Sequence, residues 1–549
     1  MRLPRCAAVL PFVSAGALLA QPPAQVTADS LLRAGRLDEA AAGYRALLER
    51  DSTQIAPVMG LGRATGRAGR VDEAIGWYRR ALAVGAAPQN LIAYLIAQQY
   101  ARRGDRDSTI AWLDRSLAFR LERRSQIATD TFFTRWRDDP EFRRLAGRPV
   151  REITDRTEGW RADIDHLVAE ARRMHVGPDR PAFGPSFTAA AAELKQRVPS
   201  LSDSRMATEV QRLLALLGDG HSILYPTSSA RVTFTRVPLD LWFFSDGLAV
   251  VGADGPLADR IGRRIVAVGG VPVAEVLRRL DPYISRDNPM GPLVLGPLFL
   301  TMPSFLEAVG LSDGRSVYYS FESSTGNLET VALLPQEFRP PAFKLLPAPG
   351  PAGNRPRYLR NPDANIWLEE LADVAAVYVQ YNQVADGPTI PIARFADSLR
   401  RTLARAGANH LIVDVRRNNG GNNGLNRPLV RAMIDFDLEP GHRTWVITSR
   451  TTFSAAQNFI NQVEQWTSAI FVGEPSGSKP NFAGEDTELL LPYSGLRGSI
   501  STRWWQDAGP LDRRQWIAPQ LSIPARSADH FGNRDPVLDA VLVAIREGR

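Results

Sequence analysis

From residue 374 onward the chain alternates short apolar segments with amphipathic ones, and this alternation limits the folds open to it. Strand-like apolar runs cover residues 374–381, 410–415, 445–448 and 469–472. Helical periodicity covers residues 392–406, 425–434 and 454–466. The alternation predicts a largely parallel sheet with right-handed crossovers. Because functional sites in such sheets lie beyond the carboxyl ends of the strands, we expect the loops 416–424, 449–454 and 473–484 on one edge.

Ser454 lies in the second of these loops, in the run Thr-Thr-Phe-Ser-Ala-Ala at 451–456. A serine on a strand-to-helix turn presents its hydroxyl at a helix N-terminus, where free N–H groups and the helix dipole favour a developing negative charge. Lys479 follows 25 residues later (479 − 454) and is one of only three lysines in the chain. A serine beside a base is the minimal arrangement for acyl transfer. The alternative is a serine that only caps the helix.

The first loop is dense in glycine and asparagine, with Asn-Asn-Gly-Gly-Asn-Asn-Gly at 418–424. Adjacent glycines let backbone N–H groups approach a ligand with no Cβ in the way. Gly420 and Gly421 are therefore candidate oxyanion donors, together with Ala455, whose N–H follows the serine. The alternative for the two glycines is plain turn geometry.

Length and composition narrow the classes of fold and function open to the chain. At 549 residues the chain is too long for one core, which predicts two to four domains. The formal net charge of +7 comes from arginines spread along the chain, and no basic stripe with interleaved aromatics supports nucleic-acid binding. The sequence has no His-Glu-x-x-His helix, no clustered metal ligands and no Walker-type loop, so we expect neither a metal nor a cofactor.

The N-terminus predicts a secretory signal over residues 1–24. Arg2 and Arg5 precede an apolar run at 7–20, and small residues offer cleavage sites. Removal through residue 21 would lower the net charge to +5 (7 − 2) and delete Cys6, the only cysteine, so the mature protein would have no disulfide and no thiol nucleophile. No later run reaches the roughly 18 apolar residues that a spanning helix needs. We expect an exported protein, periplasmic or extracellular, without a membrane span in its mature form.

A repeat occupies the region after the signal. Gly-Arg-Leu-Asp-Glu-Ala at 35–40 recurs as Gly-Arg-Val-Asp-Glu-Ala at 69–74, 34 residues later (69 − 35), and a weaker copy starts at Gly104. This period, with its helix–turn–helix pattern, resembles tetratricopeptide repeats and implies a short helical solenoid over residues 25–150. Such a unit either packs as a structural element or binds a protein partner.

The predicted secondary structure changes twice in the middle of the chain. Residues 151–235 are mainly helical and contain the loop Gly-Asp-Gly-His-Ser at 218–222. Residues 236–280 are strand-like, and the stretch 264–273 resembles half of a PDZ module, a fold that captures extended peptide ends by strand addition. We therefore expect a PDZ-like module over residues 236–285. Residues 286–365 are rich in proline and glycine and predict little.

Four motifs, taken in order, resemble the tail-specific, or C-terminal-processing, serine peptidases and their tricorn-like relatives. They are Asp-Gly-His-Ser at 219–222, Leu-Ile-Val-Asp-Val-Arg-Arg-Asn-Asn-Gly-Gly at 411–421, Thr-Phe-Ser-Ala-Ala at 452–456 and Val-Gly-Glu-Pro at 472–475. The resemblance covers roughly residues 155–549. It implies a ClpP/crotonase-like α/β core over residues 286–549, often joined to a PDZ module, with Ser454 as the nucleophile.

The resemblance leaves two candidates for the general base. In the C-terminal-processing branch the base is a lysine where Lys479 stands, although Ser478 and Pro480 replace the usual flanking glycines. In the tricorn-like branch a histidine on an upstream loop serves, and His221 occupies the comparable loop. A lysine must lose about 3 pKa units, roughly 4–5 kcal/mol, to be neutral near pH 7, whereas histidine ordinarily titrates near 6.5. We favour His221 over Lys479.

A histidine base calls for an orienting carboxylate, for which Asp507 and Asp512 are the candidates. The sequence therefore predicts a multidomain α and α/β protein: a helical repeat unit, then an α/β peptidase core with a PDZ-like module. Its expected function is that of an exported serine endopeptidase acting on peptides or unfolded proteins. Two alternatives remain: a catalytically inactive scaffold of the same fold that binds a peptide or ligand, and a non-peptidase acyl hydrolase.

Overall fold

The computed structural model describes residues 23–177, 179–253, 255–323, 325–338, 346–347, 349, 355–387 and 390–548. Contacts divide the chain into two compact units, Met1–Val150 and Arg151–Arg549. Almost all of the expected signal segment, Cys6 included, lies outside the described residues.

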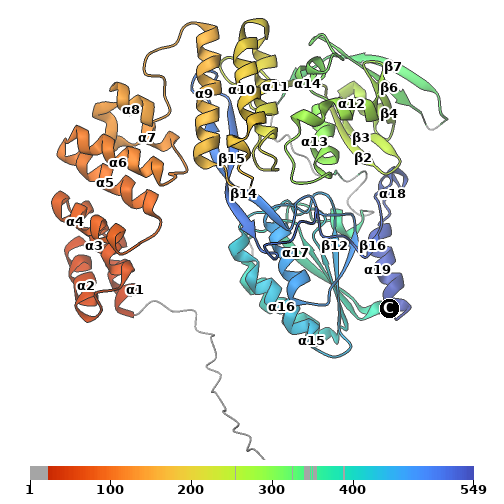
Figure 1. The fold of residues 1–549 in the computed structure, drawn as a ribbon. Helices are drawn as coiled ribbons and strands as arrows, with labels where there is room; N and C mark the ends of the chain where they lie inside the picture. Colours follow the sequence, from red (N-terminus) through yellow and green to blue (C-terminus); the bar gives the residue numbers. More distant parts are fainter. Residues whose placement is uncertain are drawn as a thin grey trace, which may run out of the picture. The chain divides into compact units, whose positions relative to one another are not determined.

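The first unit is helical. Its helices are α1 (Pro23–Arg33), α2 (Leu37–Arg50), α3 (Ile55–Arg67), α4 (Val71–Ala83), α5 (Gln89–Arg103), α6 (Arg106–Ala118), α7 (Ser125–Thr129), the 3-10 helix η1 (Thr131–Trp136) and α8 (Pro140–Leu145). Consecutive helices from α1 to α6 pack against each other (Figure 1). The repeat glycines Gly35 and Gly69 stand in the turns between helices with φ of 78°, which glycine adopts without strain.

Two glycines inside α3 make room for aromatic rings. A Cβ on Gly60 would lie 2.5 Å from the ring of Tyr44, and a Cβ on Gly62 would lie 2.5 Å from the ring of Tyr78. Both tyrosines are buried in the core of this unit. The Gly-Leu-Gly run therefore serves helix packing in the first unit.

The second unit begins with helices that share one apolar core with an antiparallel sheet. The helices are α9 (Arg156–Met174), α10 (Pro185–Arg197), α11 (Asp203–Ala215), α12 (Val273–Leu280), α13 (Gly291–Phe299) and α14 (Pro303–Ala308). The sheet has the order β2 (Leu239–Phe244), β3 (Gly247–Ala253), β4 (Arg264–Val268), β6 (Val317–Glu322) and β7 (Leu328–Leu333), and β5 (Val271–Pro272) pairs with β4. Two short strands, β1 (Thr235–Arg236) and β8 (Gln336–Glu337), pair separately.

The α/β sheet carries the predicted alternation. Its order is β16 (Leu521–Ser522), β13 (Ile470–Gly473), β12 (Arg443–Thr448), β11 (His410–Asp414), β10 (Ala376–Tyr381) and β9 (Ile366–Leu371). All neighbours are parallel except β9, which runs antiparallel to β10 at the edge. Four helices belong to this layer: α15 (Ile392–Ala406), α16 (Arg427–Asp437), α17 (Ala455–Trp466) and α19 (Pro536–Arg546), and the short α18 (Ser527–Phe531) precedes α19.

The strands of this sheet are apolar on both sides because helices cover both faces (Figure 1). On one face Val377, Val413 and Val446 pack with α15, α16 and α17. On the other face Ile412 and Trp445 pack with α19. A separate long hairpin, β14 (Asn481–Leu490) with β15 (Arg497–Gln506), follows the sheet's third loop.

The structure corrects the expectation in two places. The strand-like pattern expected through residue 280 ends with β5, because Val273, Val276 and Leu280 form the buried face of α12 at helical spacing. In addition, β6 and β7 lie beyond residue 285 yet complete the antiparallel sheet, so that sheet extends past the boundary expected there.

Within the ranges described, no helix is long and apolar enough to cross a bilayer. Those ranges also hold no group of three or more His, Cys, Asp or Glu side chains placed to bind a metal ion.

Candidate active site

Three loops follow neighbouring parallel strands and are bonded to one another. Residues 415–424 follow β11, residues 449–454 follow β12, and residues 474–480 follow β13. The Phe453 N–H donates to the Asn418 carbonyl at 3.1 Å, and the Gly477 N–H donates to the Thr452 carbonyl at 2.9 Å. The loop that carries Ser454 is therefore fixed on both sides.

Ser454 joins β12 to α17 in a strained backbone conformation. Its φ is 55° and its ψ is −124°, a region that residues other than glycine rarely adopt and that costs about 1–3 kcal/mol. Its side chain makes no capping hydrogen bond to α17, and its own N–H donates to Ser478 Oγ at 3.2 Å. The hydroxyl is therefore not used as a helix cap, the alternative that the sequence left open.

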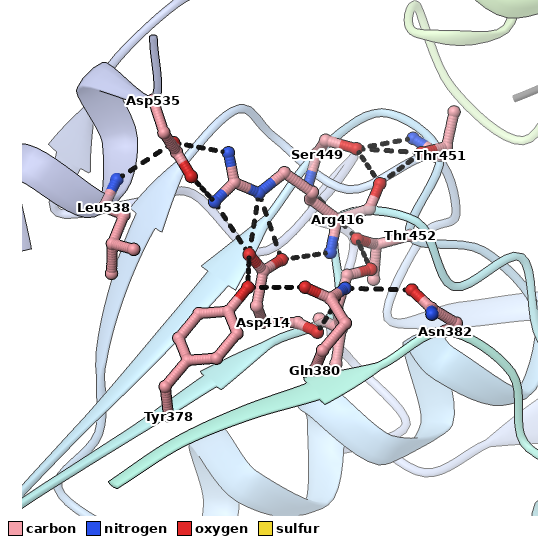
Figure 2. Close-up of polar contacts among 11 residues, drawn as sticks. Tyr378, Gln380, Asn382, Asp414, Arg416, Ser449, Thr451, Thr452, Asp535 and Leu538 are labelled. Carbon is pink, nitrogen blue, oxygen red and sulfur yellow. Dashed lines mark hydrogen bonds and ion pairs between the residues drawn. The ribbon is translucent and has the colours of Figure 1, made fainter. Parts of the chain in front are cut away.

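A buried ionic network supports the serine loop (Figure 2). The Arg416 guanidinium donates to Asp414 Oδ2 at 2.7 Å and to the two oxygens of Asp535 at 2.8 and 2.9 Å. The Arg416 carbonyl in turn accepts the hydroxyl protons of Ser449, at 2.7 Å, and Thr451. Since Asp535 caps α19 through the N–H of Leu538, this network joins α19, β11 and the serine loop.

The structure brings His221 to Ser454 across 233 positions of sequence (454 − 221). His221 Nε2 lies 2.9 Å from Ser454 Oγ, which is within the reach required of a general base. The imidazole ring stacks on Phe453 with centroids 4.5 Å apart and on Phe482 with centroids 5.7 Å apart. With Nδ1 protonated, Nε2 is the acceptor for the Ser454 hydroxyl proton.

Asp219 fixes the loop that presents His221. Its Oδ1 accepts the N–H groups of His221 at 2.9 Å and Ser222 at 2.7 Å and the Ser501 hydroxyl at 2.6 Å. Its Oδ2 lies 2.9 Å from His175 Nε2. Burial acts to raise the pKa of this carboxyl, but the hydrogen bonds and the neighbouring histidines outweigh it, and the pKa is lowered. Asp219 therefore remains an ionised acceptor for the loop.

The three oxyanion candidates differ in what their N–H groups do. The Gly420 N–H donates to Asn418 Oδ1 at 3.0 Å and is already in use. Within the described chain no hydrogen bond is recorded for the N–H of Gly421 or of Ala455. Gly421 has φ of 138°, and a Cβ there would lie 2.2 Å from the Val384 carbonyl oxygen, so this position requires glycine. At Gly420 a Cβ would lie 2.7 Å from the Ser454 Cβ.

Lys479 is not brought to the serine. The wall of the cavity that contains Ser454 and His221 does not include it. Lys479 lines two other cavities, and Gln515 also lines both of them. Among the described residues no hydrogen bond or ion pair joins Lys479 to Ser454.

The two carboxylates expected to orient His221 do not contact it. Asp507 Oδ2 accepts a hydrogen bond from Asn458 Nδ2 at 2.8 Å. Asp512 pairs with Arg514, which lowers the pKa of that carboxyl. His221 Nδ1 is buried and, within the described residues, has no hydrogen-bond partner. Asp507 and Asp512 thus bond to other residues, and these contacts could not be predicted from the sequence.

A cavity of about 710 Å³ opens beside Ser454 and His221. Much of its wall is apolar and comes from α13, α14 and the residues between them, with Leu295, Phe299, Met302 and Phe305 buried around it. Arg286 and Asp486 also line it. The site thus combines a serine–histidine pair with an apolar cavity.

Sequence reasoning missed the segment 285–288, which lies at the start of the stretch that predicted little. The Ser285 hydroxyl donates to the Ser222 carbonyl, Asp287 Oδ1 accepts the Gly220 N–H at 2.8 Å, and Asn288 Nδ2 donates to the Ser476 carbonyl at 3.0 Å. All three side chains are buried. The only sequence signal was a short polar run, Ser-Arg-Asp-Asn, beside apolar residues.

Comparison with known proteins shows a fold that this chain shares, but it does not assign the chain to a family. No protein-family model matches the chain, and no curated protein matches it. The structure of mature CPAF complexed with lactacystin is similar, with a TM-score of 0.51 and 13% identity over 71% of this chain and 99% of that chain. A mutant of CPAF gives a TM-score of 0.51 with 11% identity, over 71% of this chain and 97% of that one.

The photosystem II D1 C-terminal processing protease is also among the similar structures, at 14% identity over 66% of this chain and 93% of that chain. Its TM-score of 0.34 is too low to carry an argument. The likeness to CPAF, at such low identity, shows that the two chains share a fold.

Proposed function

We propose that this chain is an exported serine endopeptidase with Ser454 as nucleophile and His221 as general base. The observation that carries the proposal is the 2.9 Å distance between His221 Nε2 and Ser454 Oγ. The strained turn at Ser454 supports it, because strain of this kind persists where the surrounding structure over-determines a functional geometry.

The chemistry follows the acyl-transfer scheme. Ser454 Oγ attacks the peptide carbonyl carbon while His221 Nε2 takes the hydroxyl proton. His221 then gives that proton to the leaving amine as the C–N bond breaks, which leaves an acyl ester on Ser454. A water molecule, deprotonated by His221, hydrolyses the ester and restores the serine hydroxyl.

The negative oxygen of the intermediate needs donors, and Gly421 and Ala455 fit that role better than Gly420. Their N–H groups are not engaged within the described structure, whereas the Gly420 N–H is held by Asn418. Two preorganised backbone donors are the usual means of stabilising such an oxyanion. Gly420 would then have a different role: because it has no Cβ, it leaves space for the Ser454 side chain.

Lys479 is the weaker candidate for the base. It does not line the cavity of Ser454, and a lysine base must stay neutral at working pH, which requires a dry and enclosed setting. Its side chain is only partly buried. An imidazole ordinarily titrates near 6.5, so a histidine can act as a base near neutral pH without such a shift.

The apolar cavity supports a peptide substrate that places a bulky hydrophobic side chain next to the scissile bond. Buried Leu295, Phe299, Met302 and Phe305 line it, and it opens at the serine. Burying one such side chain stabilises a complex by roughly 1.5–3 kcal/mol. An unfolded protein exposes such side chains and would therefore be a suitable substrate. The repeat-like first unit would supply a separate surface for binding a protein partner.

Turnover by purified wild-type protein and its Ser454→Ala variant tests the proposal. The substrates are an unfolded protein, peptides with Phe or Asp before the cleaved bond, and a short ester. We expect Ser454-dependent cleavage of the unfolded protein and a preference for Phe over Asp. Ester turnover without peptide turnover would indicate an acyl hydrolase. Identical behaviour of wild type and variant, with both binding peptide, would indicate an inactive scaffold.

A further inference from the structure

The segment 285–288 bridges the histidine loop and the serine side of the site. Ser285 bonds to the carbonyl of Ser222, next to His221, and Asn288 bonds to the carbonyl of Ser476 in the loop after β13. Asp287, between them, accepts the Gly220 N–H through Oδ1. The segment therefore holds a carboxylate between the loop that carries His221 and the loop after β13, which itself bonds to the serine loop through the Gly477 N–H.

Asp287 and His221 each bury a polar atom that is unpartnered within the described structure. One is Asp287 Oδ2, an acceptor, and the other is His221 Nδ1, which carries the proton when Nε2 accepts from Ser454. Buried polar atoms without partners are rare in folded proteins and call for an explanation. Catalytic hydrogen bonds are often long in a free enzyme and tighten when substrate binds.

Two other carboxylates near His221 already accept hydrogen bonds from other groups. Asp219 uses both oxygens to hold loop N–H groups, Ser501 and His175. Asp486, which lines the same cavity, bonds to the hydroxyl of Tyr225 at 3.1 Å. Asp287 is the remaining carboxylate in the wall of the Ser454 cavity.

The electrostatic setting of Asp287 agrees with a charge coupled to His221. Burial raises the pKa of Asp287 to about 6, and the positive form of His221 acts in the opposite direction and lowers it. Asp219 adds a like charge, and the Ser478 hydroxyl lies close enough to favour the ionised form. Further charged and titratable groups line the three cavities that Asp287 borders. They are Arg286, Arg450 and Asp486 in the Ser454 cavity, Arg212, Asp281 and Lys479 in a second cavity, and His175, Asp179, Asp219, Asp512, Arg513 and Arg514 in a third.

We propose that Asp287 is the positioning residue for His221: its carboxylate orients the imidazole through Nδ1 and stabilises the imidazolium formed when Ser454 gives up its proton. This inference rests on the proposed roles of Ser454 and His221. It replaces the later carboxylates Asp507 and Asp512 with one that precedes the serine in the chain. An uncharged amide at 287 would keep the Gly220 contact and lose the stabilisation of the imidazolium.

The test compares the full-length wild type with Asp287→Asn and Asp287→Glu. For each we would measure peptide kcat/KM from pH 5 to 9, thermal unfolding, and the NMR titration of the His221 Cε1–H signal. For Asp287→Asn we expect a melting temperature near that of wild type and kcat/KM lower by about 10²–10⁴-fold. The acid limb of the profile and the NMR midpoint of His221 should both move to lower pH, by about 1 unit or more. Asp287→Glu should restore most of both shifts.

Asp512→Asn is the matched control, because it makes the same change at a carboxylate that pairs with Arg514 and does not contact His221. It should leave the acid limb and the His221 midpoint where they are in wild type. An Asp287→Asn protein with wild-type kcat/KM and an unmoved acid limb would overturn the proposal and leave Asp287 as a loop acceptor only. If Asp287→Asn unfolds, Asp287→Ser takes its place, because it keeps an acceptor for the Gly220 N–H and removes the charge. A lowered His221 midpoint in that variant supports the proposal, and an unmoved midpoint overturns it.

The NMR readout separates this inference from the proposed function. A moved His221 midpoint in a protein that shows no Ser454-dependent turnover would retain the Asp287–His221 coupling while rejecting the peptidase. Ser454-dependent turnover with an unmoved midpoint would retain the peptidase and reject the role of Asp287.

Discussion

At the scale of single residues, Ser454 combines a reactive position with an unfavourable backbone. Its φ of 55° and ψ of −124° suit glycine. We therefore expect Ser454→Gly to unfold at a higher temperature than Ser454→Ala, by the equivalent of about 1 kcal/mol or more, because glycine relieves the strain that alanine keeps. Both variants lack the hydroxyl and should be equally inactive. Equal melting temperatures would show that the turn is not strained.

His530 gives the second unit a stability that depends on pH. It is buried against the rings of Phe244 and Phe531, both ring nitrogens lack partners in the described structure, and burial lowers its pKa to about 4. Between about pH 4 and 6.5 the unfolded chain binds a proton that the folded chain does not, so stability rises with pH across this window. We expect wild type to lose about 2 kcal/mol more than His530→Phe between pH 8 and pH 5. Urea unfolding at the two pH values measures this difference. Equal losses would contradict it.

The site residues predicted from the sequence are those whose expected chemistry depends on local context. Ser454 stands on a strand-to-helix turn, the glycines stand after a buried strand, and His221 stands in a short loop motif. Asp287 was not predicted, because the role we propose for it depends on contacts across the fold, such as that with Gly220, 67 positions away. Asp507 and Asp512 failed as partners of His221 because each is satisfied by a neighbour.

At the scale of elements, the network of Arg416 should determine how firmly α19 holds to the sheet. Asp414, Arg416 and Asp535 are all largely buried. We expect Arg416→Met to cost about 3–5 kcal/mol, because it leaves two carboxylates buried without a cation. Arg546→Met, which removes an exposed pair with Asp373 from the same helix, is the control and should cost no more than about 1 kcal/mol. Thermal unfolding compares the two. Similar small losses would contradict the structural role of the network.

The strand–helix alternation was predictable because parallel strands buried on both faces are apolar throughout and their helices are amphipathic. The sequence predicted a helix over 392–406, and α15 has those bounds. The antiparallel sheet was harder to predict, because β4 and β6 pair across 48 intervening residues (317 − 268 − 1) that include helices. The edge strand β9 and the capping helix α19 also depend on contacts that local patterns do not encode.

At the scale of the whole molecule, each unit has apolar cores of its own. Tyr44, Tyr78 and their neighbours lie in cores made of residues before 150. The cores around the α/β sheet consist of residues after 151. Units with separate cores usually fold separately. We therefore expect the fragment 151–549 to fold and to keep Ser454-dependent turnover of short peptides within about threefold of the full chain. A fragment that is folded but inactive would contradict this.

The rate of fluorophosphonate modification tests the central claim, that Ser454 is a nucleophile activated by His221, most directly. Intact mass would follow the adduct, and peptide mapping would locate it, in wild type, His221→Ala and Lys479→Ala. The structure predicts one adduct on Ser454, a rate reduced about 10²–10⁴-fold by His221→Ala, and a rate within a few fold of wild type for Lys479→Ala. No adduct on Ser454, or a rate that depends on Lys479 and not on His221, would contradict it.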